Sequence, residues 1–250
     1  MPPSPFHYPP SRIVNYMPNL NSDERDKFAE LAAEWWNPDG PCRTLHDINP
    51  CRLNYLVSRM SLRRARVADI GCGGGILSEA LAHSGAEVTA IDATAELIQI
   101  ARQHVEQENL NVRYEIGTVE TLLKSRTEYY DAVICMELIE HVPDADALIK
   151  DCARLVKPSG LLVLSTLNRT PQSYLFGIAA AEYVLGLLPR GTHDYAKFLK
   201  PSELARSARQ YHLDLEDVTG MAYNPITRTA KLSNSVSINY FATFKRRTQG

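Results

Sequence analysis

Residues 67–75 read VADIGCGGG, an apolar run that ends in four glycines and one cysteine. This pattern predicts a buried β-strand that turns sharply into a helix, because glycine accepts positive φ angles and lets a ligand approach the backbone. One acid, Asp69, stands two residues before the first glycine, and another, Asp92, ends the next apolar run. Residues 67–92 therefore predict a strand, glycine loop, helix and second strand that together hold a cofactor.

The residues around the loop discriminate between two classes of cofactor. A nicotinamide dinucleotide site wants Gly or Ala at the sixth position of G-x-G-x-x-G, which is Ile76 when the count begins at Gly71. S-adenosylmethionine has no phosphates and instead needs one carboxylate near its amino group and another at its ribose. Asp69 can bind the amino group directly or through water. Asp92 can accept both ribose hydroxyls, although it also suits an N-cap for residues 94–108. The pattern favours S-adenosylmethionine.

Short apolar runs alternate with helical stretches from residue 66 onward. Strands are predicted at 66–70, 87–92, 112–116, 131–136 and 161–166, and helices near 75–84, 94–108, 120–124 and 145–156. This alternation indicates parallel crossovers, with helices on both faces of an open α/β sheet. Residues 213–218 and 236–244 are strand-like without a full helix between them, which favours an antiparallel last strand. We therefore expect a mostly parallel, seven-stranded sheet.

Two helices are predicted ahead of the sheet, within residues 21–60. Asn21 followed by Glu24 is typical of a capping box, and apolar residues then recur at helical spacing. Asn49 and Pro50 suit the N-cap and first position of the second helix. Both helices thus precede the cofactor loop.

Composition sets the broad class of the protein. The 250 residues are 44% hydrophobic and 22% charged, which suits one globular domain over 21–250 behind a proline-rich, disordered tail over 1–20. The net charge of −2 argues against a nucleic-acid partner. Five cysteines without a C-x-x-C pair argue against disulfides and favour a reducing compartment. With no signal-peptide pattern at the start, a cytoplasmic protein is expected.

Residues 137–144 read ELIEHVPD and follow the predicted strand 131–136, at the sheet edge where ligands bind. Glu137, Glu140 and His141 are spaced i, i+3, i+4, which would place two carboxylates and an imidazole on one face of a helical turn. Such a set suits a divalent ion, Mg²⁺ or Zn²⁺, that favours deprotonation of a phenol. Two alternatives stay open. His141 can be a metal-free general base, or the two carboxylates can merely solvate a helix start.

An apolar insert occupies 169–200, with its most apolar part at 174–188. That part is interrupted by Glu182 and is shorter than the roughly 20 residues needed to span a bilayer. Its aromatic residues and flanking basic residues suit a helix at a lipid surface, or the lining of a channel for a hydrophobic substrate. A lid or core helix packed on the sheet is the alternative.

Residues 67–92 resemble the Rossmann-like class I methyltransferases, in which an acid precedes alternating glycines such as Gly71 and Gly73. From about residue 24 to 244 the chain resembles the ubiquinone-biosynthesis O-methyltransferases more specifically. The matching runs are Trp35-Trp36, 45–52, 69–77, 137–144, 165–169, 191–194 and 223–226. So many dispersed runs are more specific than the glycine loop alone.

The resemblance implies methylation of a phenolic hydroxyl on a polyprenylated ring, with a divalent metal ion and a lipid-surface contact through the insert. It implies cofactor contacts at Arg52, Gly71, Asp92 and Met136, and metal ligands at Glu137, Glu140 and His141. It also implies ubiquinone-biosynthesis proteins as partners and a place on the cytoplasmic side of a bacterial membrane, or alternatively on the matrix face of the mitochondrial inner membrane. A methyltransferase of a soluble metabolite and a non-enzymatic, cofactor-binding subunit are the rival functions.

Overall fold

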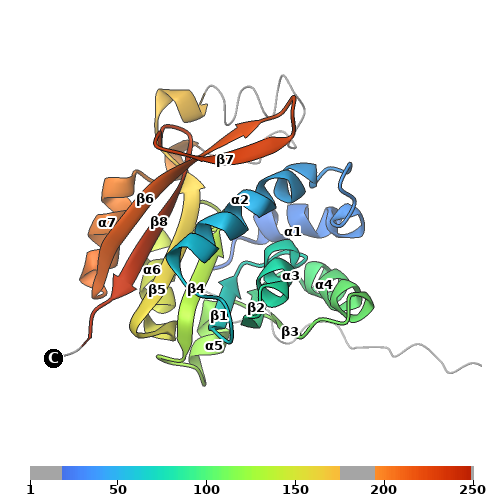
Figure 1. The fold of residues 1–250 in the computed structure, drawn as a ribbon, viewed down its shortest axis with the longest axis horizontal. Helices are drawn as coiled ribbons and strands as arrows, with labels where there is room; N and C mark the ends of the chain where they lie inside the picture. The colour runs from blue at the N-terminus through green and yellow to red at the C-terminus, as the bar shows by residue number, and fades with distance from the viewer. Residues whose placement is uncertain (1–18, 175–194, 249–250) are drawn as a thin grey trace, which may run out of the picture.

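The computed structural model describes residues 19–174 and 195–248. Within them, eight strands form one sheet in the order β3-β2-β1-β4-β5-β8-β6-β7 (Figure 1). The strands are β1 (Arg66–Ile70), β2 (Glu87–Asp92), β3 (Val112–Ile116), β4 (Tyr130–Met136), β5 (Val156–Leu167), β6 (Leu213–Asn224), β7 (Thr229–Ser233) and β8 (Asn239–Arg246). Strands β1 to β5 run parallel, and β8 lies antiparallel between β5 and β6. The mostly parallel sheet with an antiparallel late strand is confirmed.

Strand β7 is an addition to the seven predicted strands. Strand β6 continues six residues past the expected end at 218, and β7 pairs antiparallel with it, from Asn224 opposite Thr229 to Gly220 opposite Ser233. The Asn224 side chain accepts hydrogen bonds from the backbone N–H groups of Ile226, at 2.9 Å, and Thr227, at 3.2 Å, which closes the turn between the strands. The hairpin follows from this local turn chemistry.

Helices cover both faces of the sheet (Figure 1). One face packs against α2 (Arg43–Arg59), α3 (Ile76–His83) and α4 (Ala95–Gln107), and the other against α5 (Val119–Leu123), α6 (Ala145–Leu155) and α7 (Pro201–Gln210). Strand β4 feeds both cores by alternation, because Ala132, Ile134 and Met136 face the first set while Val133 and Cys135 face the second. Apart from Asp131, its side chains are almost completely buried, as expected for a strand covered on both faces.

Helix α1 (Ser22–Glu30) begins where the sequence predicts. The Asn21 side chain accepts hydrogen bonds from the backbone N–H groups of Asp23, at 3.1 Å, and Glu24, at 3.4 Å. The tail predicted over 1–20 is wrong at its end, because Asn19 is buried and its side-chain amide exchanges two hydrogen bonds of 2.7 Å with the backbone of Asp144. Residues 1–18 lie outside the described range.

Helix α2 begins at Arg43, so the predicted start at Asn49 is wrong. Pro50 lies inside the helix, where it removes one backbone hydrogen bond. Ile48, Cys51 and Tyr55 are buried against the sheet, and this burial outweighs the local cost of the proline. The Asn49 side chain caps no helix start; it donates a hydrogen bond of 3.1 Å to the carbonyl of Ile76.

The apolar run 174–188 falls almost entirely outside the described residues, which resume at 195 with the short 3-10 helix η4 (Tyr195–Lys197). Elsewhere in the described chain, none of the helices has the length and hydropathy required to cross a bilayer.

Candidate active site

A cavity of about 720 Å³ opens at the carboxyl edge of the parallel strands. Strands β2 and β3 lie on one side of β1 in the sheet, and β4 and β5 lie on its other side. In sheets of this kind ligands bind where the strand order reverses, which here is the boundary between β1 and β4. The cavity has the size of a small-molecule site. Its walls come from α1, the residues on either side of η2 (Ala32–Glu34), α2, the glycine loop, the residues after β4, and strands β6 and β8.

The glycine loop needs its glycines for backbone conformation and for packing. Gly71 and Gly73 have φ angles of 72° and 56°, which disfavour any residue with a Cβ. At Gly74 the reason is steric, because a Cβ would lie 2.3 Å from Cδ1 of Trp35. The neighbouring Trp36 donates from Nε1 to the Gly74 carbonyl at 3.0 Å. The two tryptophans after helix α1 therefore fix the position of the glycine loop, Trp35 by packing and Trp36 by a hydrogen bond.

The two acids of the cofactor segment both line the cavity. Asp92 accepts hydrogen bonds from the backbone N–H groups of Gly73, at 3.0 Å, and Thr94, at 2.8 Å, so it ties the glycine loop to the start of α4. Thr94 itself is the N-cap of α4. Asp69 is 2% exposed and accepts a hydrogen bond of 2.6 Å from Ser78 Oγ. Burial raises the pKa of Asp69 to about 6, against the effect of that hydrogen bond.

Arg52 is a buried cation on the cavity wall, carried by α2. Its Nη2 lies 3.8 Å from Glu137 Oε1, while its Nε is buried without a hydrogen-bond partner in the described chain. Burial lowers the pKa of Arg52, and the charges of Glu137 and Asp69 oppose that effect. A buried guanidinium keeps its charge, so Arg52 retains a donor for an anionic ligand group.

The residues after β4 form a turn, so the predicted helical face for Glu137, Glu140 and His141 is wrong. Glu137 has a φ angle of 53°, in the left-handed region, and the His141 N–H donates to the Leu138 carbonyl at 2.9 Å. A left-handed residue interrupts the helical geometry on which the predicted shared face depends. The spacing i, i+3, i+4 carries no information outside a helix.

Each of the three predicted metal ligands contacts a partner of its own. Glu137 accepts a hydrogen bond of 2.7 Å from Ser165 Oγ, and Glu140 accepts one of 2.9 Å from Thr166 Oγ1. Across residues 19–174 and 195–248, no group of three or more His, Cys, Asp or Glu side chains is arranged to hold a metal ion. In this arrangement the three residues do not fit a shared divalent ion.

His141 lines the cavity and pairs with a carboxylate from α1. Its Nδ1 lies 3.1 Å from Glu24 Oε2, and the ring of Phe28 meets its own edge to face, with centroids 5.6 Å apart. Burial lowers the pKa of His141, but the hydrogen bond to Glu24 and the charges of Glu140 and Glu24 raise it above its ordinary value of 6.5. The sequence assigned Glu24 to a capping box, and its pairing with a residue 117 positions away was not predictable from spacing.

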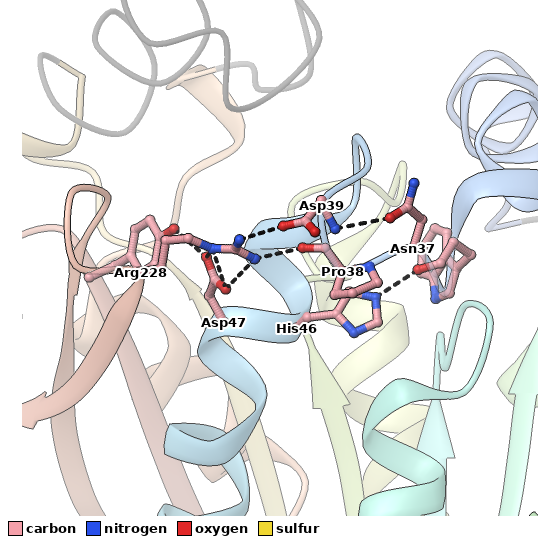
Figure 2. A network of polar contacts seen from close by, with 8 residues as sticks. Asn37, Pro38, Asp39, His46, Asp47 and Arg228 are labelled. Atoms are coloured by element: carbon pink, nitrogen blue, oxygen red, sulfur yellow. Dashed lines mark hydrogen bonds and ion pairs between the residues drawn. The ribbon is translucent and has the colours of Figure 1, made fainter.

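A polar network fastens the β6–β7 turn to the start of α2 (Figure 2). Arg228 donates to Asp47 from Nε at 3.1 Å, to Asp39 from Nη1 at 2.6 Å and to the Pro38 carbonyl from Nη2 at 2.6 Å. Tyr223 donates to the same Asp47 at 2.7 Å. Tyr223 also lines the cavity, so this network sets the position of one cavity wall.

Comparison with known proteins identifies relatives along most of the chain. Residues 68–164 match the family model of a methyltransferase domain. The ubiquinone biosynthesis O-methyltransferase of Xanthomonas oryzae pv. oryzae (strain PXO99A) is 51% identical over 224 residues, which cover 90% of this chain and 94% of the relative. The protein of the same name from Nitrosospira multiformis is 48% identical over 233 residues, covering 93% and 98%.

Solved structures share the fold at much lower identity. The magnesium protoporphyrin IX methyltransferase of Synechocystis PCC 6803 with bound SAH gives a TM-score of 0.66 at 21% identity, covering 90% of this chain and 99% of that one. The PH0226 protein of Pyrococcus horikoshii OT3 gives 0.65 at 17% identity, covering 88% and 99%. These neighbours support the class I methyltransferase fold.

Proposed function

Because the chain belongs to the family of ubiquinone biosynthesis O-methyltransferases, we propose that it methylates a phenolic hydroxyl of a polyprenylated catechol or phenol, with S-adenosylmethionine as the methyl donor. One observation carries the proposal. A cavity with a predominantly apolar lining extends from the glycine loop to His141 and on to the β6–β8 wall. Such a cavity accommodates a polar cofactor at one end and an apolar ring at the other.

The residues around the loop suit each part of the cofactor. Arg52, a buried guanidinium with an unpartnered Nε, would bind the cofactor's carboxylate. Asp69 would accept from the amino group, and Asp92 from the ribose hydroxyls through the lone pairs that Gly73 and Thr94 leave unused. Gly71 and Gly73 would let the cofactor approach the backbone, and Met136 would contact it from the end of β4. The sulfonium of the bound cofactor supplies the methyl group.

His141 acts as the general base in this proposal. A phenol with a pKa near 10 is mostly protonated at neutral pH, so its oxygen must lose a proton as it attacks the methyl group. The imidazole accepts that proton, and Glu24 at its Nδ1 stabilises the imidazolium that results. The chain's remaining task is to hold the phenol in line with the methyl group, which needs no covalent enzyme intermediate.

A labelled-methyl assay with a short-tailed catechol tests this assignment. His141→Gln is expected to lower kcat by about 100-fold or more, while the affinity for the cofactor stays unchanged. His83→Gln, at an exposed position away from the cavity, is the matched control. Unchanged kcat in His141→Gln would refute the role of His141.

The divalent ion implied by the resemblance is tested separately. With the side chains placed as described, methylation is expected to continue after chelation. A strict requirement for Mg²⁺ or Zn²⁺ would mean that Glu137, Glu140 and His141 leave Ser165, Thr166 and Glu24 when the ion binds. Activity titrated with each metal after chelation distinguishes the two cases.

We extend the proposal to a lipid surface and to other proteins of ubiquinone biosynthesis as partners. The support is the composition of 174–188, aromatic and apolar between basic residues, together with the apolar tail expected on the substrate. Flotation with anionic vesicles is expected to recover the full chain and not a variant lacking 174–188. Flotation of both to the same extent would contradict a membrane contact through 174–188, and flotation of neither would favour an acceptor in solution.

A further inference from the structure

Glu137 is held from three directions at the point where β4 ends. Ser165 on β5 donates to its Oε1 at 2.7 Å, Asn239 on β8 donates to Oε1 at 3.1 Å and to Oε2 at 3.3 Å, and Arg52 on α2 lies 3.8 Å from Oε1. Glu137 also keeps an unfavourable positive φ angle of 53°. These contacts fix the carboxylate in one place.

The fixed carboxylate determines how the Asn239 amide is turned. The NH₂ group of Asn239 donates to both carboxylate oxygens of Glu137, so its Oδ1 faces away from Glu137. That Oδ1 is buried and has no hydrogen-bond partner in the described part of the chain. A buried amide oxygen without a donor is costly, and a hydroxyl on a bound ligand would supply that donor.

The surroundings of Asn239 identify the kind of ligand. In the sheet, Asn239 lies opposite Leu167 of β5 and Met221 of β6. These three residues and Ile238 all line the cavity, so apolar side chains flank the Asn239 amide at this wall. Such a wall suits the face of an aromatic ring, and the oxygen suits a hydroxyl on that ring.

The position of β8 separates this wall from the cofactor loop. Strands β4 and β5 lie between β1 and β8, which places the two strands about 14 Å apart at about 4.8 Å per strand spacing. Asp69 and Asp92, which we propose bind the cofactor's amino group and ribose, are on β1 and β2. Asn239 therefore lies three strands from the residues proposed for the amino group and ribose, beyond Glu137 and Arg52, and we place it on the acceptor side of the cavity.

We propose that Asn239 Oδ1 accepts a hydrogen bond from a second hydroxyl on the acceptor ring, one that is not being methylated. Asn239 then makes the enzyme select rings with two hydroxyls over rings with one. The inference rests on the proposed function, because it requires a phenolic acceptor. It adds a residue that determines which phenol is accepted.

Two acceptors with the same short tail test the proposal, a catechol and the matching phenol that lacks the neighbouring hydroxyl. Asn239→Ala is expected to lower kcat/KM for the catechol by about 10- to 100-fold and to change the value for the phenol less than threefold. Ser165→Ala is the matched control, because it removes another hydrogen bond to Glu137 and leaves Asn239 Oδ1 in place. It should affect both acceptors by the same factor.

An equal loss for both acceptors in Asn239→Ala would overturn the proposal, since it would show that Asn239 only supports Glu137. No loss for either would overturn it as well. If the unaltered protein binds the cofactor but methylates neither ring, the proposed function fails separately. Equilibrium binding of the two rings then decides the role of Asn239, with a preference for the catechol expected in the unaltered protein and absent in Asn239→Ala.

Discussion

The pair formed by Glu24 and His141 makes a specific prediction about how stability depends on pH. The pKa of Glu24 is lowered from 4.5 to about 2 by its hydrogen bond with His141 and by the charges of His141 and Lys27, while burial opposes this shift. Neutralising the acid with Glu24→Gln removes this interaction and keeps the side chain's shape. At about 1.4 kcal/mol per pKa unit the shift sets an upper bound of about 3 kcal/mol. Because Glu24 is partly exposed, we expect a loss of about 1–2 kcal/mol in the free energy of unfolding.

The sign of the effect follows from both partners. A lowered carboxyl pKa stabilises the folded state above pH 4.5, and this contribution disappears as the pH falls toward 2. The raised pKa of His141 contributes fully below 6.5 and is lost as the pH rises through its folded value. Glu137 and Glu140 also act on His141 and remain in the variant. The difference between Glu24→Gln and the unaltered protein is therefore expected to be largest between about pH 4.5 and 6.5.

Urea denaturation at pH 3, 5.5 and 9 measures this difference directly. Glu30→Gln, at an exposed position of the same helix, is the control for the loss of an acid. A difference that is the same at all three pH values would refute the reasoning, because a merely structural role of the side chain does not depend on the charge of His141.

Three further predictions concern other parts of the site. Gly74→Ala is expected to weaken cofactor binding by more than about tenfold, because its Cβ would lie 2.3 Å from Trp35. Calorimetric titration measures the change in affinity. The control Gly85→Ala, outside the cavity lining, should lower the stability of the protein without weakening cofactor binding. Asp69→Asn is expected to stabilise the cofactor-free protein at pH 8 by about 2–3 kcal/mol, because a carboxyl whose pKa is raised from 3.8 to about 6 disfavours folding once it is ionised. The affinity for the cofactor should fall at the same time. A variant that is less stable than the unaltered protein at pH 8 would contradict the argument. Arg228→Ala is expected to speed hydrogen exchange in residues 37–40 and 224–229, because Arg228 links these two segments through Asp39 and Asp47. Arg247→Ala, which removes a separate pair with Asp214, should leave exchange in both segments unchanged.

Local pattern determines the core of this fold. The strand, glycine loop and helix over 67–83 are specified by neighbouring residues, because a short apolar run and glycines at positive φ have few other conformations. The same holds for the N-cap at Asn21, whose side chain bonds to backbone only two and three residues away. Candidate cofactor ligands such as Asp69 and Asp92 could be identified from the sequence for this reason, because each is positioned by its own strand.

Tertiary structure alone decided which side chains meet on the acceptor side. Asn239 reaches Glu137 only because β8 inserts antiparallel between β5 and β6, and Glu24 reaches His141 only because α1 packs over the sheet edge. The left-handed backbone at Glu137 removed the helical turn on which the predicted shared face of Glu137, Glu140 and His141 depended. Spacing predicts contact only within a regular element, whereas these contacts depend on how distant elements pack. The glycine loop and its cofactor can therefore be predicted from the sequence alone, whereas the acceptor site is determined by the tertiary structure.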